Sequence, residues 1–236
     1  MLRAVLFDFN GVLVDDEPIH LALFQEVLAE EGIELDREGY YRRYLGFDDR
    51  GAFSAILADA GQEAGAPRLA RLIARKAAYY QERIRREGYP FFPGAAALLR
   101  SALARGWMLG VVSGALHDEV EGALRQLGVR DHFKAIVAAE DVAEGKPDPE
   151  GYLRALDALN SQPPLPERLF HPHEVLVIED SPAGLAAAAA AGLPTLGVAN
   201  TYPPEELAGA GAVLPSLEGV TAEILEQSYR RIVGPT

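Results

Sequence analysis

The sequence predicts an α/β protein in which a doubly wound parallel sheet carries an inserted all-helical domain. Two observations predict this class. Short apolar runs alternate with segments of helical periodicity along most of the chain, which is typical of a parallel sheet with helices on both faces. One long stretch near the N-terminus shows helical patterns and no convincing strand, which indicates an insertion.

The elements of the sheet domain are predicted in chain order from these patterns. The expected strands cover residues 4–7, 108–112, 136–138, 175–178 and 195–198. The expected helices between and after them cover residues 94–104, 117–127, 149–159 and 182–191. The last helix is rich in alanine, which suits a helix that lies close against a sheet.

Residues 16–86 interrupt this alternation. Three apolar stripes at helical spacing predict helices in this segment and no strand. The chain returns to the sheet near residues 88–94, where Pro and Gly end a helix. We therefore expect a core of residues 1–15 and 87–236 and a helical cap of residues 16–86.

Composition excludes several classes of function. The formal net charge is −13, and nucleic acids and anionic membranes are bound by clustered Lys and Arg, so we expect neither partner. The chain has no cysteine, which excludes disulfides and thiolate chemistry. The opening apolar run stops at Asp8 and no later run approaches the length of a membrane span, so we expect a cytoplasmic location.

Polar residues follow four of the predicted strands at the points where these strands end. They are Asp8 with Asn10, Ser113, Lys146, and Glu179 with Asp180. Each alone also fits a structural role, as a helix cap, a turn residue or a solvated side chain. Ligands bind beyond the carboxyl ends of parallel strands, so the repetition predicts one site on one edge of the sheet.

This set of residues suits phosphate chemistry. The three carboxylates are the hard oxygen ligands that Mg²⁺ prefers. Lys146 adds positive charge, and Ser113 with the backbone N–H of Gly114 can cradle phosphoryl oxygens at a helix start. Asp8 could then serve as a covalent nucleophile that forms an aspartyl phosphate.

Four segments carry these residues in order along the chain. They are DFNGVLVDDEPIH, VVSGA, GKPDPEGYL and VLVIEDSPAGLAAAAAAGL. Together they resemble the four motifs of the haloacid dehalogenase-like superfamily, in the branch that contains β-phosphoglucomutase and phosphoglycolate phosphatase. The resemblance covers nearly the whole chain, includes the position of the helical cap, and implies a Rossmann-like catalytic core.

The resemblance also implies an activity, the Mg²⁺-dependent hydrolysis of a small phosphorylated metabolite. In this interpretation Asp8 attacks phosphorus and also binds Mg²⁺, and Asn10 contributes its backbone carbonyl to the metal. Glu179 and Asp180 complete the acidic metal side.

The remaining implied roles concern the phosphoryl group and the organic part of the substrate. Ser113 and Lys146 would hold the transferring phosphoryl group. The cap residues expected to face the substrate are His20, Arg50 and Lys76.

Asn10 departs from the family pattern, which has aspartate there as general acid and then general base. An amide cannot cycle a proton near neutral pH, and general acid–base catalysis is typically worth about 10²- to 10⁴-fold. Five explanations are open: a substrate with a good leaving group, His20 as a surrogate acid or base, loss of turnover, an introduced change that traps a complex, or partial deamidation promoted by Gly11.

Three alternative functions share parts of this pattern. A phosphosugar mutase uses the same site when its phosphoenzyme is protected from water. A non-catalytic protein that binds a phosphorylated ligand would keep the binding residues alone. Halide-displacing relatives also lack the second aspartate, but they generally dispense with Mg²⁺, whereas this chain retains an acidic pair in its fourth motif.

Overall fold

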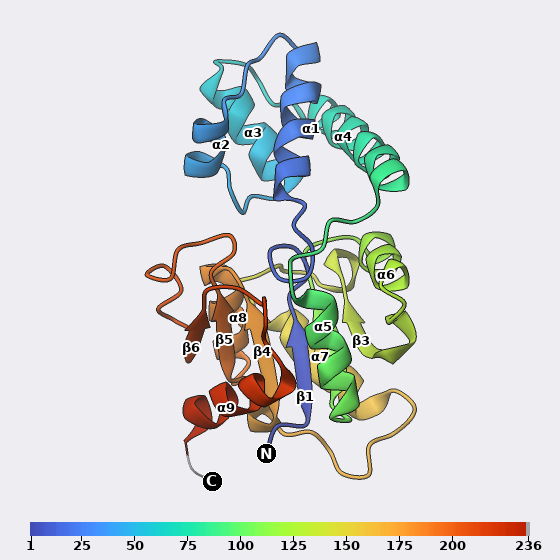
Figure 1. The fold of residues 1–236 in the computed structure, drawn as a ribbon. Coiled ribbons are helices and arrows are strands. Elements are labelled where there is room, and N and C mark those ends of the chain that lie inside the picture. The colour runs from blue at the N-terminus through green and yellow to red at the C-terminus, as the bar shows by residue number, and fades with distance from the viewer. Residues whose placement is uncertain (235–236) are drawn as a thin grey trace. The chain divides into compact units, whose positions relative to one another are not determined.

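The strand β1 (Ala4–Phe7) lies at the centre of a parallel sheet in the computed structural model of the chain (Figure 1). The structure describes residues 1–234, and over these residues the sheet has six strands in the order β3-β2-β1-β4-β5-β6. All the side chains of β1 are fully buried, because helices cover both faces of the sheet. A strand buried on both faces is apolar throughout, which is the pattern that predicted it.

The predicted α/β class is confirmed by the alternation of strands and helices after β1. The further strands are β2 (Met108–Val112), β3 (Phe133–Val137), β4 (Val175–Glu179), β5 (Thr195–Val198) and β6 (Ala212–Leu214). The helices of this core are α5 (Ala95–Ala104), α6 (His117–Gln126), α7 (Glu150–Ser161), α8 (Pro182–Ala190) and α9 (Ala222–Val233).

Helices cover the two faces of the sheet in pairs. Helices α5 and α9 contact each other on one face, and α7 and α8 contact each other on the opposite face (Figure 1). On the second face, Leu6, Val112 and Val177 from the sheet pack with Tyr152 of α7 and Ala187 of α8. The small side chains of α8 let this helix lie close to the strands, as its alanine-rich sequence indicates.

The sheet differs from the prediction at its two edges. The outer strand β3 begins at Phe133, three residues before the predicted start. The prediction began too late because Lys134 interrupts the apolar run of this strand. The other outer strand, β6, was not predicted: it has three residues, all half-buried, and so lacks a continuous apolar run. Helix α9 was not predicted either, although Leu225 and Tyr229 bury one of its faces.

Residues Asp16–Tyr89 form a second compact unit, which is built from helices. These are α1 (Glu17–Glu30), α2 (Arg37–Arg43), α3 (Asp49–Asp59) and α4 (Ala66–Glu87). The unit has its own hydrophobic cluster, which includes Phe24, Phe53 and Leu72. The side chains of Asp36 and Asp48 cap α2 and α3 by accepting backbone N–H hydrogen bonds.

The two units meet in sequence at Asp15/Asp16 and at Tyr89/Pro90. The second junction lies three residues beyond the expected one at 86/87, because α4 continues to Glu87 before the chain turns back. None of the helices in residues 1–234, α4 included, combines the length and the apolarity that crossing a bilayer requires.

Hydrogen bonds of Glu174 link the loop before β4 to the segment that precedes β1. Its carboxylate accepts hydrogen bonds from Arg3 at 3.2 Å, from Arg168 at 2.5 Å and from the backbone N–H of His171 at 3.1 Å. The Arg3 guanidinium also lies over the ring of Phe170, 4.4 Å from its centroid. Burial alone would raise the pKa of Glu174, but these hydrogen bonds outweigh burial and lower the pKa from 4.5 to about 2.

This lowered pKa predicts a loss of stability in acid. Because the pKa is about 2 in the folded chain and 4.5 in the unfolded chain, ionised Glu174 stabilises the fold above pH 4.5. This contribution is lost as the pH falls from 4.5 towards 2. One pKa unit corresponds to about 1.4 kcal/mol, and solvent screens the exposed Arg168. We therefore expect ionised Glu174 to contribute about 2 kcal/mol to the free energy of unfolding at neutral pH.

Urea unfolding measures this effect directly. Glu174→Gln should be less stable than the wild type at neutral pH and close to it at about pH 2, where Glu174 becomes protonated in the folded chain too. Glu205→Gln, at an exposed position, is the control and should match the wild type at both pH values. A stability difference for Glu174→Gln that is the same at both pH values would contradict the assignment.

Candidate active site

The carboxyl end of β1 brings Asp8 to the edge of the sheet. The Asp8 backbone N–H donates to the carbonyl of Ile178 in β4 at 2.9 Å, so the strand pairing continues one residue past β1. The chain then turns back, because the N–H groups of Leu13 and Val14 both donate to the carbonyl of Phe9. This turn leaves the Asp8 carboxylate at the sheet edge.

Gly11 makes this turn possible. Its φ is +80°, which L side chains rarely adopt, and a Cβ there would lie 1.9 Å from Oδ2 of Asp180. The Gly11 N–H donates to Val14 at 2.9 Å, and the Gly11 carbonyl accepts from the Asn200 amide at 2.8 Å. Since both backbone groups are held, the turn opposes the cyclic geometry that deamidation of Asn10 requires.

Lys146 is the cation at the centre of the candidate site. Its ammonium group donates to Asp8, to Oε1 of Glu179 at 2.6 Å and to the carbonyl of Val112 at 3.1 Å. The carboxylate of Glu150 accepts two backbone N–H groups of the preceding loop and so shapes it. Although burial lowers the pKa of Lys146, the charges of Asp8 and Glu179 raise it well above its usual value.

Glu179 ends β4 and is fully buried. Its Oε1 accepts from Lys146 and, at 3.0 Å, from the Tyr152 hydroxyl. Its Oε2 accepts from the backbone N–H of Asp180 and from both the N–H and the hydroxyl of Ser181. A carboxylate offers about four lone pairs, so these donors already satisfy Glu179.

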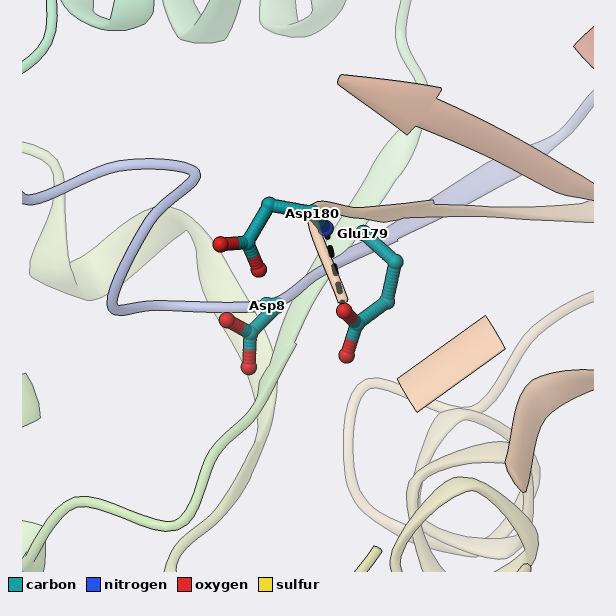
Figure 2. Close-up of side chains that lie close together, drawn as sticks. All are labelled: Asp8, Glu179 and Asp180. Atoms are coloured by element: carbon teal, nitrogen blue, oxygen red, sulfur yellow. Dashed lines mark hydrogen bonds between the residues drawn. The ribbon is translucent and has the colours of Figure 1, made fainter. Parts of the chain in front are cut away.

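Asp8, Glu179 and Asp180 form the one group of three potential metal ligands found among residues 1–234. One ligand atom from each lies within 4.8 Å of the other two. Figure 2 shows the carboxylates of Asp8 and Asp180 on the side of the loop that follows β1, whereas the Glu179 carboxylate points the other way.

Burial gives this acidic group unusual proton affinities. It raises the pKa of Asp8 to about 7, against the opposing charge of Lys146. Burial, together with the charges of Asp8 and Glu179, raises the pKa of Asp180 well above its usual range. A divalent cation would relieve this repulsion, and oxygen atoms are the donors that Mg²⁺ and Ca²⁺ take, so the residues fit such an ion.

Asn10 and Ser113 lie on the same edge of the sheet. The Ser113 hydroxyl donates to Oδ1 of Asn10 at 3.4 Å and accepts from the N–H of Ala115 at 2.9 Å. Gly114 follows Ser113 in an exposed turn. The structure thus brings together the six predicted core residues with side chains: Asp8, Asn10, Ser113, Lys146, Glu179 and Asp180.

Several residues of this site were not predicted from the sequence. A hydrogen bond from the Thr201 side chain opposes the rise in the pKa of Asp180. Asn200 and Thr201 follow the end of β5, so the rule that found the other residues applies to them as well. Tyr152 carried no such signal, because an aromatic residue on the apolar face of α7 indicates a core position.

The cap unit brings two of its three predicted residues together. Lys76, only 2% exposed, donates to Asp49 at 2.5 Å and lies 2.9 Å from Nδ1 of His20. Nε2 of His20 lies 3.3 Å from Asp16. Since an ammonium group only donates, Nδ1 accepts and the ring proton resides on Nε2. Arg50 is exposed on α3 and is not part of these described contacts.

Sequence comparison agrees with the motifs. Residues 2–192 match the family described as haloacid dehalogenase-like hydrolase. The chain belongs to this family. The hydrolase is 31% identical over 227 residues to validoxylamine A 7′-phosphate phosphatase of Streptomyces hygroscopicus subsp. limoneus, covering 93% of this chain and 96% of that protein. It is also 31% identical over 222 residues to phosphoglycolate phosphatase of Rhodospirillum rubrum, covering 90% and 86%. The predicted resemblance is therefore confirmed.

The hydrolase is also similar to a solved structure with a bound sugar phosphate. CbbY of Rhodobacter sphaeroides, as an Asp-to-Asn mutant in complex with xylulose-(1,5)bisphosphate, superposes with a TM-score of 0.78. The two chains are 29% identical, with 93% of this chain and 96% of CbbY covered. The comparison supports the fold of the sheet core and of the helical unit.

Gly184 in the first turn of α8 packs against the buried carboxylate of Glu179. A Cβ at this position would lie 1.7 Å from Oε1 of Glu179. Glycine to alanine inside a helix usually stabilises by about 1 kcal/mol. Here we expect Gly184→Ala to destabilise by about 2 kcal/mol, because the side chain would overpack the buried carboxylate.

Denaturant unfolding of the two glycine variants checks this packing. Gly209→Ala is the control, since nothing lies within 4 Å of a Cβ there, and it should leave the stability unchanged. If Gly184→Ala were as stable as the wild type, the close contact between α8 and Glu179 would be refuted.

Proposed function

We propose that this hydrolase is a Mg²⁺-dependent phosphatase of small phosphomonoesters that forms an aspartyl phosphate on Asp8. The observation that carries the proposal is the buried ammonium group of Lys146, which contacts Asp8 and Glu179 beside a cluster of carboxylates. Attack of a carboxylate on a phosphate dianion needs preorganised positive charge, and Lys146 together with a divalent cation would supply it.

The comparisons support the class of substrate. The two relatives at 31% identity are named as phosphatases of validoxylamine A 7′-phosphate and of phosphoglycolate. The CbbY mutant holds a sugar bisphosphate. These ligands differ in their carbon skeletons and share a phosphate ester on a small polar molecule, which is the class that we propose for this chain.

The reaction proceeds by two displacements at phosphorus. An Asp8 oxygen forms a bond to phosphorus, the bond from phosphorus to the ester oxygen breaks, and the departing alkoxide takes a proton from solvent. Water then attacks phosphorus and loses a proton, the bond to Asp8 breaks, and orthophosphate is released. Lys146 and Ser113 would hold the phosphoryl oxygens through both steps.

The metal would be held mainly by Asp8, Asp180 and the backbone carbonyl of Asn10. Glu179 is a further predicted ligand, although its carboxylate already accepts hydrogen bonds from Lys146 and neighbouring groups. When bound, Mg²⁺ neutralises the negative charge that gathers on the phosphoryl oxygens and the carboxylates.

Asn10 limits both displacements, because its amide neither supplies a proton to the alcohol nor takes one from water. His20 does not offer a ready substitute, since its two ring nitrogens are engaged by Lys76 and Asp16 inside the cap unit. We therefore propose slow turnover of alkyl phosphates, and an aspartyl phosphate on Asp8 that forms faster than it is hydrolysed when the leaving group is good.

The variant Asn10→Asp tests this proposal. It should raise the hydrolysis of alkyl phosphates by about 10²- to 10⁴-fold, because it restores a group that can transfer the proton. With p-nitrophenyl phosphate, whose leaving group needs no proton, the wild type should release a burst of p-nitrophenol that approaches one equivalent per chain. Asp8→Asn is the control and should abolish both signals.

The outcome also separates the alternatives. If neither the wild type nor Asn10→Asp released phosphate from any ester, the phosphatase proposal would be excluded and a protein that only binds a phosphorylated ligand would be favoured. Release of halide without Mg²⁺ would favour halide displacement instead. Conversion of one sugar phosphate isomer into another without release of phosphate would favour a mutase.

Metal binding has a test of its own that does not depend on turnover. Mg²⁺ at about a hundredfold its dissociation constant should stabilise the fold by about 2.7 kcal/mol, through binding to the folded chain only. Thermal unfolding should show this shift for the wild type and lose it for Asp180→Asn. Glu140→Gln removes an exposed carboxylate outside the cluster and should retain the shift; equal shifts in both variants would refute the site.

A further inference from the structure

Tyr152 reaches the candidate site from the hydrophobic core. It lies on α7 with no exposed surface, and its ring packs in the cluster that joins α7 and α8 to the sheet. Its hydroxyl donates to Oε1 of Glu179 at 3.0 Å. Its ring also lies near the cation, with Nζ of Lys146 5.5 Å from the ring centroid. Both polar partners of this buried side chain therefore belong to the candidate site.

The hydrogen bond of Tyr152 ends a linear series of contacts. Asp8 accepts from Lys146, Lys146 also donates to Oε1 of Glu179, and the same Oε1 accepts from Tyr152. Two donors therefore share one carboxylate oxygen. Hydrogen bonds to an ionised group are strong, so each donor reduces the attraction that this oxygen exerts on the other.

This sharing affects where the ammonium group of Lys146 is held. With the Tyr152 hydroxyl in place, Oε1 of Glu179 has two donors, one for each of its lone pairs, and Lys146 remains divided between Glu179 and Asp8. Without the hydroxyl, Lys146 would be the only side-chain donor from outside the 179–181 segment left to Glu179 in the described contacts. The ammonium group would then move towards Glu179 and away from the phosphoryl position beside Asp8.

We propose that Tyr152 is a positioning residue that, through its hydrogen bond to Glu179, keeps Lys146 directed at Asp8 and at the phosphoryl group. The proposal rests on the phosphatase function proposed above. It assigns Tyr152 no contact with substrate and no proton transfer. Its effect is on how fast phosphoryl transfer to Asp8 occurs, because a displaced cation stabilises the transition state less well.

Tyr152→Phe in the full chain is the direct test, since it removes the hydroxyl and keeps the ring. Tyr229→Phe is the matched control: Tyr229 is also buried, and its hydroxyl donates to the backbone carbonyl of His173 at 2.5 Å, outside the site. Both variants lose one tyrosine hydrogen bond and should lose a similar amount of thermal stability.

Rapid-mixing measurements with p-nitrophenyl phosphate and Mg²⁺ should separate the two variants. We expect Tyr152→Phe to slow the burst of p-nitrophenol by about tenfold, the effect of about 1.4 kcal/mol on a rate. The control should stay within about twofold of the wild type. In a Glu179→Gln background, adding Tyr152→Phe should cause little further slowing, because the two residues act through one contact.

Each other result would overturn the positioning role. A normal burst in Tyr152→Phe, an equal slowing in Tyr229→Phe, or a full additional loss in the Glu179→Gln background would each do so. In these cases the wild type still releases p-nitrophenol and the phosphatase proposal stands. Absence of any burst or turnover in the wild type and in Asn10→Asp would instead remove the phosphatase proposal, and the positioning role with it.

Discussion

The structure of the candidate site depends on the compensation of buried negative charge by a single ammonium group. Lys146 uses its three N–H donors on Asp8, Glu179 and the carbonyl of Val112. Without it, three buried carboxylates with ligand atoms within 4.8 Å of one another would lack a compensating cation. An unpaired buried charge costs several kcal/mol, on the order of a small protein's whole stability. The ammonium group is therefore a structural element as well as the cation that would meet a phosphoryl group.

The fold makes this compensation possible by bringing distant segments to one edge of the sheet. The pairing of β1 with β2 on one side and β4 on the other places Asp8 between the loops that follow its neighbours. The loop after β3 then supplies Lys146, held in shape by the first turn of α7. Small residues complete the arrangement, because Gly11 and Gly184 leave the room that the carboxylates of Asp180 and Glu179 occupy.

The sequence was sufficient for the features that depend on local pattern. Strands buried on both faces have continuous apolar runs, so β1, β2 and β5 have the predicted bounds, and residues at their ends could be found by position alone. Features that depend on which surfaces pack together were not predictable. The sequence did not indicate that Tyr152 reaches Glu179, or that Asp49 and Asp16 enclose Lys76 and His20, because a charge or an aromatic ring on a helix has the same pattern whichever neighbour it meets.

The strand order also has a consequence for how the protein is made. Asp8, the proposed nucleophile, is synthesised about 170 residues before Glu179, which ends the strand beside it. Until β4 is available, β1 lacks one of its two neighbours, and such long-range pairing forms late in folding. The nascent chain therefore carries the Asp8 carboxylate without Glu179 beside it until β4 has been synthesised, and the proposed activity on phosphate esters would arise only once β4 pairs with β1.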